Sequence, residues 1–344
     1  MQSFLKEIFM IFVTGGCGFI GSNFILDWLK SGDEPILNID SLTYASNVKN
    51  LATLTADRRY IFARCDINDS DHITELLKRH KPRAVINFAA ESHVDRSITG
   101  PIDFINTNIV GTFRLLEAVR AYFCDLDLNA KNKFRFFHIS TDEVYGTLAS
   151  GDDKFRETSQ YRPNSPYSAS KASSDHLVRA YFKTFGLPVL TTNCSNNYGP
   201  YQFTEKLIPL CVKNALLGKE LPLYGDGLQI RDWLYVEDHC AAIRLVLDQG
   251  IVGDVYNVGG VNEMSNLAVV KQICSILDDL RPRENSRLYA EQIKFVKDRL
   301  GHDRRYAVDI SKIDRELGWK PKESFNSGLL KTVAWYVENH QWLD

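Results

Sequence analysis

One segment decides the fold of this chain: Thr14-Gly15-Gly16-Cys17-Gly18-Phe19-Ile20-Gly21. It follows an apolar run at residues 8–14 and opens a helical pattern at 20–30, so Gly15, Gly18 and Gly21 fall in a turn between a strand and a helix. Glycine lets such a turn bend sharply and lets its backbone approach a diphosphate, whose charge the helix N-terminus attracts. A structural tight turn needs the same residues, so the three glycines alone leave the ligand open.

An acid lies where the second strand pattern ends. Asp40 stands 19 residues beyond Gly21, where a carboxylate can bond the adenosine ribose of a dinucleotide and repel a 2′-phosphate. Together, the turn and the acid predict a dinucleotide site that prefers NAD to NADP. Asp40 could instead cap the segment that follows it. Asp66, at the end of the third strand pattern, suits an adenine contact or a cap for the helix that begins near Ser70.

Short apolar runs alternate with amphipathic stretches through the first half of the chain, which is typical of βαβ units on a parallel sheet. The pattern predicts a doubly wound, Rossmann-type α/β fold. Its strands are expected at 8–14, 36–40, 60–64, 84–89, 134–140 and 188–193, and its helices at 20–30, 70–79, 101–122 and 168–185.

The pattern changes after about residue 194, where turn signals separate single helices. Residues 232–260 read as a helix followed by a strand at 255–258, which could return to the first sheet. We therefore expect two rigidly packed domains with a discontinuous boundary. A NAD-binding Rossmann domain would hold residues 1–193 plus about 230–262, and a smaller C-terminal α/β lobe for the substrate would hold 194–229 plus about 263–344.

Composition narrows the class of protein. The 344 residues are 44% hydrophobic and 24% charged, with 41 Lys and Arg against 43 Asp and Glu, which gives no reason to expect a nucleic-acid or membrane-surface partner. No apolar run approaches the roughly 18 to 20 residues of a membrane span, and we expect a cytoplasmic protein. The seven cysteines form no C-x-x-C pair and predict neither a disulfide framework nor a metal site.

Groups capable of acid–base chemistry follow the fifth strand pattern. Thr141, Asp142 and Glu143 lie where that strand ends, and open α/β sheets bind ligands at the carboxyl ends of strands. Tyr167 and Lys171 open the next helix four residues apart and so share one face. A nearby ammonium favours the phenolate and would make the phenol a usable base. Tyr-x-x-x-Lys arises about once by chance in a chain of this size, but its place after Thr141 makes it specific.

Seven strings of the sequence belong together. They are Gly15-Gly16-Cys17-Gly18-Phe19-Ile20-Gly21-Ser22, Ala89-Ala90-Glu91-Ser92-His93-Val94-Asp95, Ser140-Thr141-Asp142-Glu143-Val144-Tyr145-Gly146, Tyr167-Ser168-Ala169-Ser170-Lys171, Asn196-Asn197-Tyr198-Gly199-Pro200-Tyr201, Arg231-Asp232-Trp233-Leu234 and Gly301-His302-Asp303-Arg304-Arg305-Tyr306. From about residue 10 to about residue 340 the chain resembles the extended short-chain dehydrogenase/reductase superfamily, and within it the dTDP-glucose 4,6-dehydratase family. The glycine turn and the Tyr-Lys pair are common to the superfamily, whereas the adjacent acids Asp142 and Glu143 are more specific. The resembling epimerases carry Ser or Thr there, and the related GDP-mannose dehydratases and UDP-glucuronate decarboxylases keep a Glu but have Ser in place of the Asp.

The resemblance implies a reaction in three steps, dependent on tightly bound NAD. Tyr167 takes the proton of the sugar 4-hydroxyl while NAD accepts the C4 hydride, with Lys171 lowering the phenol pKa and Thr141 orienting the hydroxyl. Glu143 removes the C5 proton, and a protonated Asp142 donates to the departing C6 hydroxyl. Return of the hydride to C6 gives dTDP-4-keto-6-deoxyglucose, a precursor of deoxysugars such as rhamnose. A solvated turn is the alternative for the two acids.

The resemblance also assigns binding residues and a homodimer. Besides the catalytic residues Tyr167 and Lys171, the expected cofactor contacts are Gly15, Gly18, Phe19, Ile20, Gly21, Asp40, Ser41, Leu42, Thr43, Asp66, Ile67, Ala89, Ala90, Glu91, Ser92, Thr107 and Asn196. The expected substrate contacts are Ser92, Thr141, Asn197, Lys206, Leu207, Pro222, Leu223, Tyr224, Arg231, Asn266, Arg299 and His302. A homodimer is implied through the helices near 101–122 and 168–185, although core packing explains their amphipathic pattern equally well.

Alternatives remain at the level of the sequence. The chain could be a dehydratase, decarboxylase or epimerase of another sugar nucleotide, or a catalytically silent NAD-binding scaffold, since fold alone does not give function. Each basic residue could form a surface salt bridge. Residues 281–305 hold eight Lys and Arg against four Asp and Glu, a local excess where the resemblance puts the diphosphate.

Overall fold

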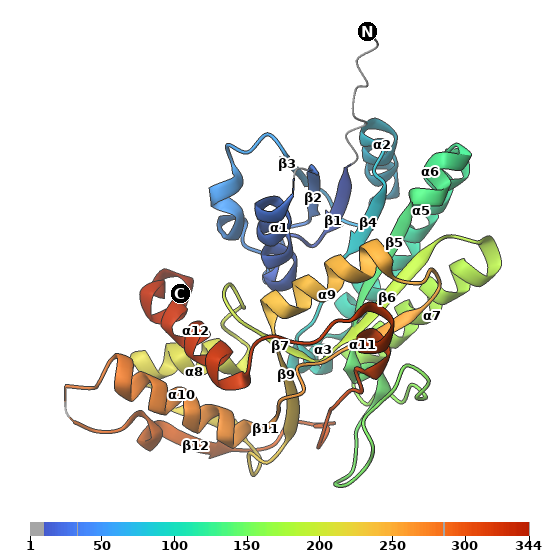
Figure 1. The fold of residues 1–344 in the computed structure, drawn as a ribbon. Coiled ribbons are helices and arrows are strands. Elements are labelled where there is room, and N and C mark those ends of the chain that lie inside the picture. The colour runs from blue at the N-terminus through green and yellow to red at the C-terminus, as the bar shows by residue number, and fades with distance from the viewer. Residues whose placement is uncertain (1–9, 33, 285, 344) are drawn as a thin grey trace.

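The structure is a computed structural model that describes residues 10–32, 34–284 and 286–343. Its centre is a parallel sheet of seven strands in the order β10-β6-β5-β4-β1-β2-β3 (Figure 1). The six strands expected from the first half are present, and the strand at 255–258 returns to pair with β6. Residues 8 and 9 of the first predicted strand lie outside the described residues. The strands are β1 (Ile11–Thr14), β2 (Ile36–Asp40), β3 (Tyr60–Arg64), β4 (Ala84–Asn87), β5 (Arg135–Thr141), β6 (Val189–Cys194) and β10 (Val255–Val258).

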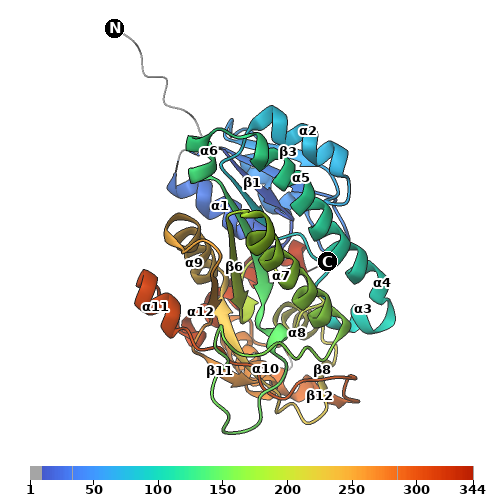
Figure 2. The same ribbon diagram turned by 90° about the vertical axis from the view of Figure 1, so that its right-hand side faces the viewer.

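Helices cover both faces of this sheet. One face packs against α1 (Phe19–Ser31), α9 (Val236–Gln249) and α11 (Ser311–Leu317), and the other against α2 (Ser70–His80), α5 (Thr112–Asp125) and α7 (Pro166–Phe185). Two separate apolar clusters result, because apolar side chains leave a parallel strand on both of its faces. In Figure 2, α5 and α7 run beside each other on the outside of the molecule. The predicted doubly wound fold is confirmed.

The helix predicted at 101–122 is divided. It comprises α4 (Pro101–Phe104), a π-helical stretch η2 (Ile105–Gly111) and α5. Within the π-helical stretch, Asn108 turns inward: its side chain accepts from Glu91 N and donates to Glu91 O and Ser170 Oγ. A π-helical insertion of this kind is common at functional sites. Shorter helices complete this part: η1 (Val48–Leu54), α3 (Val94–Thr99), α6 (Leu128–Lys133) and η3 (Asp142–Tyr145).

A smaller unit lies at the end of the sheet where the strands finish. Its core is shared by α8 (Leu207–Leu216), α10 (Asn266–Leu280) and α12 (Phe325–Glu338). Two small sheets pack with these helices, one formed by β7 (Asn196–Tyr198), β9 (Ile230–Tyr235) and β11 (Glu263–Ser265), the other by β8 (Leu221–Tyr224) and β12 (Ile293–Val296). The remaining short helices are η4 (Tyr289–Gln292) and η5 (His340–Trp342).

Residues 232–235 correct one expectation. They were predicted to begin a helix, but they form β9, and the helix begins at Val236. The aromatic side chains of Trp233 and Tyr235 pack in the core of the smaller unit, where a strand between β7 and β11 buries them better than a helical turn. The division into two domains at residues 193, 230 and 262 stays a prediction, and α11 packs on β10 and α9 of the larger sheet.

Within the described ranges, none of the helices has both the length and the apolar character that a membrane span requires.

Gly260 joins the large sheet to the small one. A Cβ added at this residue would lie 1.8 Å from Trp233 O, so we expect Gly260→Ala to lower the free energy of unfolding by more than about 3 kcal/mol. Thermal and urea unfolding would measure this loss. Gly32→Ala is the control, because a Cβ there meets only Trp28 O at 3.7 Å. Equal stability of the two variants would contradict the packing described.

Candidate active site

The glycine turn is packed so closely that a side chain would not fit at Gly15 or Gly21. Gly15 has φ +69°, and a Cβ on it would lie 2.7 Å from Ala89 N. A Cβ on Gly21 would lie 2.5 Å from Gly15 O. Gly18 precedes α1 and offers no side chain to cap it, so the first amides of the helix face the cleft as donors for an anion. The turn therefore fits the diphosphate of a dinucleotide.

Asp40 ties this turn to the end of β2. Its carboxylate accepts from Cys17 N at 2.9 Å and from Leu42 N at 2.8 Å. It does not cap the helix that follows, since Asn47 caps η1. Asp66 likewise does not cap α2, whose N-cap is Asp69. Both acids line the cleft, and their ribose and adenine contacts stay predictions.

Cys17 is fully buried beside the turn, and burial raises the pKa of its thiol to about 12. It packs against Asn38, whose side chain donates to the sulfur. The residue is therefore an unreactive packing group.

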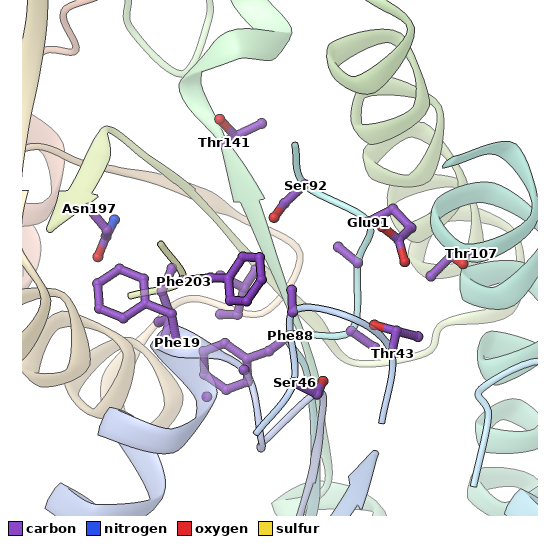
Figure 3. Close-up of a pocket in the computed structure, with 18 of the residues that line it drawn as sticks. Phe19, Thr43, Ser46, Phe88, Glu91, Ser92, Thr107, Thr141, Asn197 and Phe203 are labelled. Carbon is purple, nitrogen blue, oxygen red and sulfur yellow. The ribbon is translucent and has the colours of Figure 1, made fainter. Parts of the chain in front are cut away.

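A single cleft runs from the glycine turn to the end of β5 (Figure 3). In Figure 3, Glu91 and Thr107 lie on one side of it, Phe19 and Phe203 on the other, and Thr141 at the far end. Every expected cofactor residue lines this cleft except Leu42, which adopts φ +59° and contributes its backbone N–H to Asp40. The sequence interpretation missed these lining residues: Ile39, Ala45, Ser46, Cys65, Phe88, Ile139, Ser140, Cys194, Ser195, Gln202, Phe203 and Glu205.

Some of the missed residues carried a signal and others did not. Phe88 directly follows β4, so its position at a strand end could have indicated it. Gln202, Phe203 and Glu205 lie in a loop without periodicity. That loop is fixed from outside the cleft, because Tyr336 of α12 donates to Gln202 O at 2.7 Å and Tyr201 packs against Trp335 and Trp342.

Asp142 and Glu143 occupy a 3-10 turn that continues β5. Asp142 is 1% exposed, and burial, together with the charges of Glu143 and Asp232, holds its pKa well above the usual range. Thr141 Oγ1 lies 3.4 Å from Asp142 Oδ1 and accepts from Glu143 N. Burial thus favours the protonated form of Asp142. The alternative of a solvated turn is excluded by its burial.

Glu143 is held differently from its neighbour. It lines the cleft, whereas Asp142 does not. Burial raises the pKa of Glu143, and the cations of Arg299, Arg231 and Lys206 oppose that shift. A carboxylate beside three cations stays available as a base.

Tyr167 and Lys171 lie in the same cleft, but their electrostatics differ from the expectation. Burial and the charge of Glu143 hold the phenol pKa well above its usual range, with only a hydrogen bond from Thr141 opposing them. Lys171 Nζ donates to Ile139 O at 2.9 Å. Burial also lowers the pKa of Lys171.

The expected substrate residues separate into two groups. Ser92, Thr141, Asn197 and Lys206 line the cleft, and Lys206 Nζ donates to Ser92 O. The others lie outside the cleft surface. Of these, Arg231 is buried over the Tyr306 ring, and Arg299 and Tyr224 both contact Asp95, at 3.6 Å and 3.2 Å. His302 faces the Tyr224 ring. The remainder begin or form the nearby elements α8, β8 and α10: Leu207, Pro222, Leu223 and Asn266.

Comparison with known proteins extends over nearly the whole chain. Residues 12–332 match the family model described as GDP-mannose 4,6 dehydratase. A dTDP-glucose 4,6-dehydratase of Xanthomonas campestris pv. campestris (strain B100) is 58% identical over 331 residues, 96% of this chain and 94% of that protein. The dTDP-glucose 4,6-dehydratase of Bacillus anthracis str. Ames, crystallised in complex with NAD, superposes with a TM-score of 0.86 at 45% identity, covering 98% of this chain and 100% of that one. The Streptomyces venezuelae enzyme with NAD and TYD bound gives 0.88 at 44%, covering 97% and 100%.

Fold and cleft together define a nucleotide-sugar-modifying member of the extended short-chain dehydrogenase/reductase class. The relatives identify the family within this class, since the match at 58% identity covers 96% of this chain and 94% of the relative. The chain belongs to the dTDP-glucose 4,6-dehydratase family.

Burial of Asp142 has a consequence for stability. A carboxyl whose pKa is raised on folding costs nothing below its unfolded pKa, and the cost grows as pH rises toward the folded pKa. We therefore expect Asp142→Asn to be more stable than the parent at pH 8, with a difference that shrinks toward pH 4. Thermal unfolding between pH 4 and pH 8 would measure it, and a difference independent of pH would contradict a protonated Asp142.

Proposed function

We propose that this chain converts dTDP-glucose to dTDP-4-keto-6-deoxyglucose and water, using NAD that it regenerates in each turnover. The observation that carries this proposal is the pair Asp142 and Glu143. Burial holds the pKa of Asp142 well above its usual range, whereas three cations oppose the rise in the pKa of Glu143, which lines the dinucleotide cleft. An epimerase expels no water and needs no such pair. The product would serve the biosynthesis of a deoxysugar.

The first step needs a proton acceptor at the sugar 4-hydroxyl. NAD, when bound, supplies the acceptor of the C4 hydride and returns that hydride to C6. Tyr167 takes the hydroxyl proton, and Thr141, next to it, orients the hydroxyl. Burial holds the phenol pKa high, and the resemblance gives Lys171 the role of lowering it for the proton transfer.

The second step removes water across C5 and C6. The 4-ketone acidifies the C5 proton, which Glu143 takes as a base. Asp142 gives its proton to the C6 hydroxyl, and the C6–O bond breaks to release water. As the hydride returns to C6, Glu143 gives the proton back to C5, which completes the 6-deoxy product. The two adjacent carboxyls act in opposite directions because their surroundings separate their pKa values.

The substrate diphosphate would bind at the basic end of the cleft. Arg231, Arg299 and Lys206 surround Glu143 there, and guanidinium groups suit a diphosphate through paired hydrogen bonds. The remaining nucleotide contacts are those that the family resemblance assigns to residues of β8 and α10.

Deuterium placed at C4 of dTDP-glucose should appear at C6 of the product. The reason is that one bound cofactor carries it between the two carbons without exchange. Mass spectrometry and NMR of the product would follow the label. Loss of deuterium to solvent or to free NADH would rule this scheme out.

Asp142→Asn should slow elimination by about 10²- to 10³-fold, because general acid catalysis of the departing hydroxyl is lost. The 4-keto-glucose intermediate should still form, as shown by rapid quench and mass spectrometry. Asp238→Asn serves as the matched control, since Asp238 is equally a buried carboxyl but binds Lys322 N and Glu323 N far along the chain. A variant that lost oxidation and kept elimination would reverse the assignment.

We also propose that the chain forms a homodimer in the cytoplasm. Large apolar side chains are exposed along α4, η2, α5 and α7, namely Ile102, Ile105, Phe113 and Phe185, and a second copy would cover them by a self-complementary contact. The described cysteines are all free thiols, in keeping with a reducing compartment.

Phe113→Asp should therefore yield monomers in analytical ultracentrifugation, whereas the parent sediments as a dimer. Phe113 is 45% exposed on α5. Leu128→Asp is the control, since Leu128 is 80% exposed on α6 outside the proposed contact. A monomeric parent, or a dimeric Phe113→Asp variant, would exclude this interface.

A further inference from the structure

Two buried side chains near Lys171, those of His138 and Asp175, take no part in the reaction steps proposed above. Tyr167, Lys171 and Asp175 follow one another at intervals of four on α7, so they share the helix face that meets β5 and β6. His138, on β5, lies next to Asp175 and Lys171. Its Nε2 lies 3.3 Å from Asp175 Oδ1 and 3.5 Å from Lys171 Nζ. The exposed fractions of His138, Lys171 and Asp175 are 0%, 4% and 6%.

Hydrogen bonds to the other edge of the imidazole assign its tautomer. Thr14 donates to Asn87 Oδ1 at 2.6 Å, which turns the Asn87 amide nitrogen toward His138 Nδ1 at 3.3 Å. Nδ1 therefore accepts, and the single proton of a neutral ring lies on Nε2. Nε2 is the ring atom that lies 3.3 Å from Asp175 Oδ1. Burial and the charge of Lys171 lower the pKa of His138 to about 4, so the ring stays neutral in the working range.

Donors converge on the second oxygen of Asp175. Ser140 Oγ and Tyr161 OH each donate to Oδ2 at 2.9 Å, and Asn193 Nδ2 lies 3.3 Å from it. Three donors therefore fix the orientation of the Asp175 side chain. A buried carboxylate and a buried ammonium thus face the same neutral imidazole.

Lys171 requires such a counter-charge. The titratable groups around it are Tyr167 and Asp175 on its own helix, His138 on β5 and Cys194 on β6. Burial lowers the pKa of Lys171, and Asp175 is the largest influence that raises it. An ammonium moved out of water without a partner would lose its proton.

We propose that Asp175 is a positioning residue of the reaction: across the neutral His138, its carboxylate keeps the Lys171 ammonium charged and directed along β5. This inference rests on the proposed role of Lys171. It explains why an acid lies two helical turns beyond the tyrosine, out of reach of the cleft surface, which Asp175 does not line.

The test compares Asp175→Asn with Asp238→Asn, the same isosteric change at a carboxyl that is also 6% exposed. Trace acetylation of the purified holoenzyme, followed by mass spectrometry from pH 6 to pH 10, gives the titration midpoint of Lys171 directly. We expect this midpoint to fall by at least about one pH unit in Asp175→Asn, and the alkaline limb of kcat for dTDP-glucose to fall with it. Asp238→Asn should move neither.

The outcomes separate the two proposals. If the Lys171 midpoint falls while the pH profile of kcat stays, the pairing with Asp175 is upheld and the role of Lys171 in the reaction is refuted. If the midpoint stays, or moves equally in both variants, the pairing is overturned.

A measurement on the parent protein covers the case in which Asp175→Asn fails to fold. Nitrogen-15 NMR of the histidine-labelled enzyme at pH 6 should show one neutral ring with its proton on Nε2, assigned to His138 by its loss in His138→Gln. A protonated His138, or a proton on Nδ1, would overturn the arrangement.

Discussion

Removal of water from the end of β5 is the constraint on which the site depends. In a dry environment a carboxyl keeps its proton, a phenol resists losing one and an ammonium tends to give one up. Asp142, Tyr167 and Lys171 all show these shifts. Whether a carboxyl here acts as an acid or as a base then depends on the charges of the neighbouring side chains. Two acids add to the rise in the Asp142 pKa, with Arg231 opposing it, whereas three cations oppose the rise in the Glu143 pKa and favour its action as a base.

The fold explains how two adjacent residues acquire opposite surroundings. A 3-10 turn holds about three residues per turn, so neighbouring side chains point roughly 120° apart. Thr141 begins this turn at the end of β5 and accepts from Glu143 N. Glu143 consequently projects into the cleft, and Asp142 projects into the protein beside Asp232. A regular strand would also separate them, but it would carry both away from the carboxyl edge where ligands bind.

Much of this arrangement could be predicted from the sequence, because local patterns encode it. Gly15 and Gly21 need their backbone space, and the alternating elements specify a parallel sheet with Asp40, Asp66 and Thr141 at one edge. The features that could not be predicted from the sequence depend on packing between segments that are far apart in the chain. Trp233 and Tyr235 lie in a strand because β7 and β11 pair with that segment on either side. Glu205 enters the cleft on an aperiodic loop that α12 holds from a distance of more than a hundred residues along the chain.

The pKa of Tyr167 shows most clearly where sequence reasoning falls short. Spacing places Lys171 and Tyr167 on one face of the helix. Only the structure shows that the Lys171 ammonium donates to Ile139 O, and that burial and the charge of Glu143 raise the phenol pKa. The charge of Glu143 thus works against the phenol that acts before it. Cations that balance Glu143 ease this conflict, so Arg231, Arg299 and Lys206 affect both proton transfers. A diphosphate bound there, as proposed, would share these cations with Glu143 and raise its affinity for a proton. Substrate binding would in this way strengthen the base at the moment that the C5 proton must be removed.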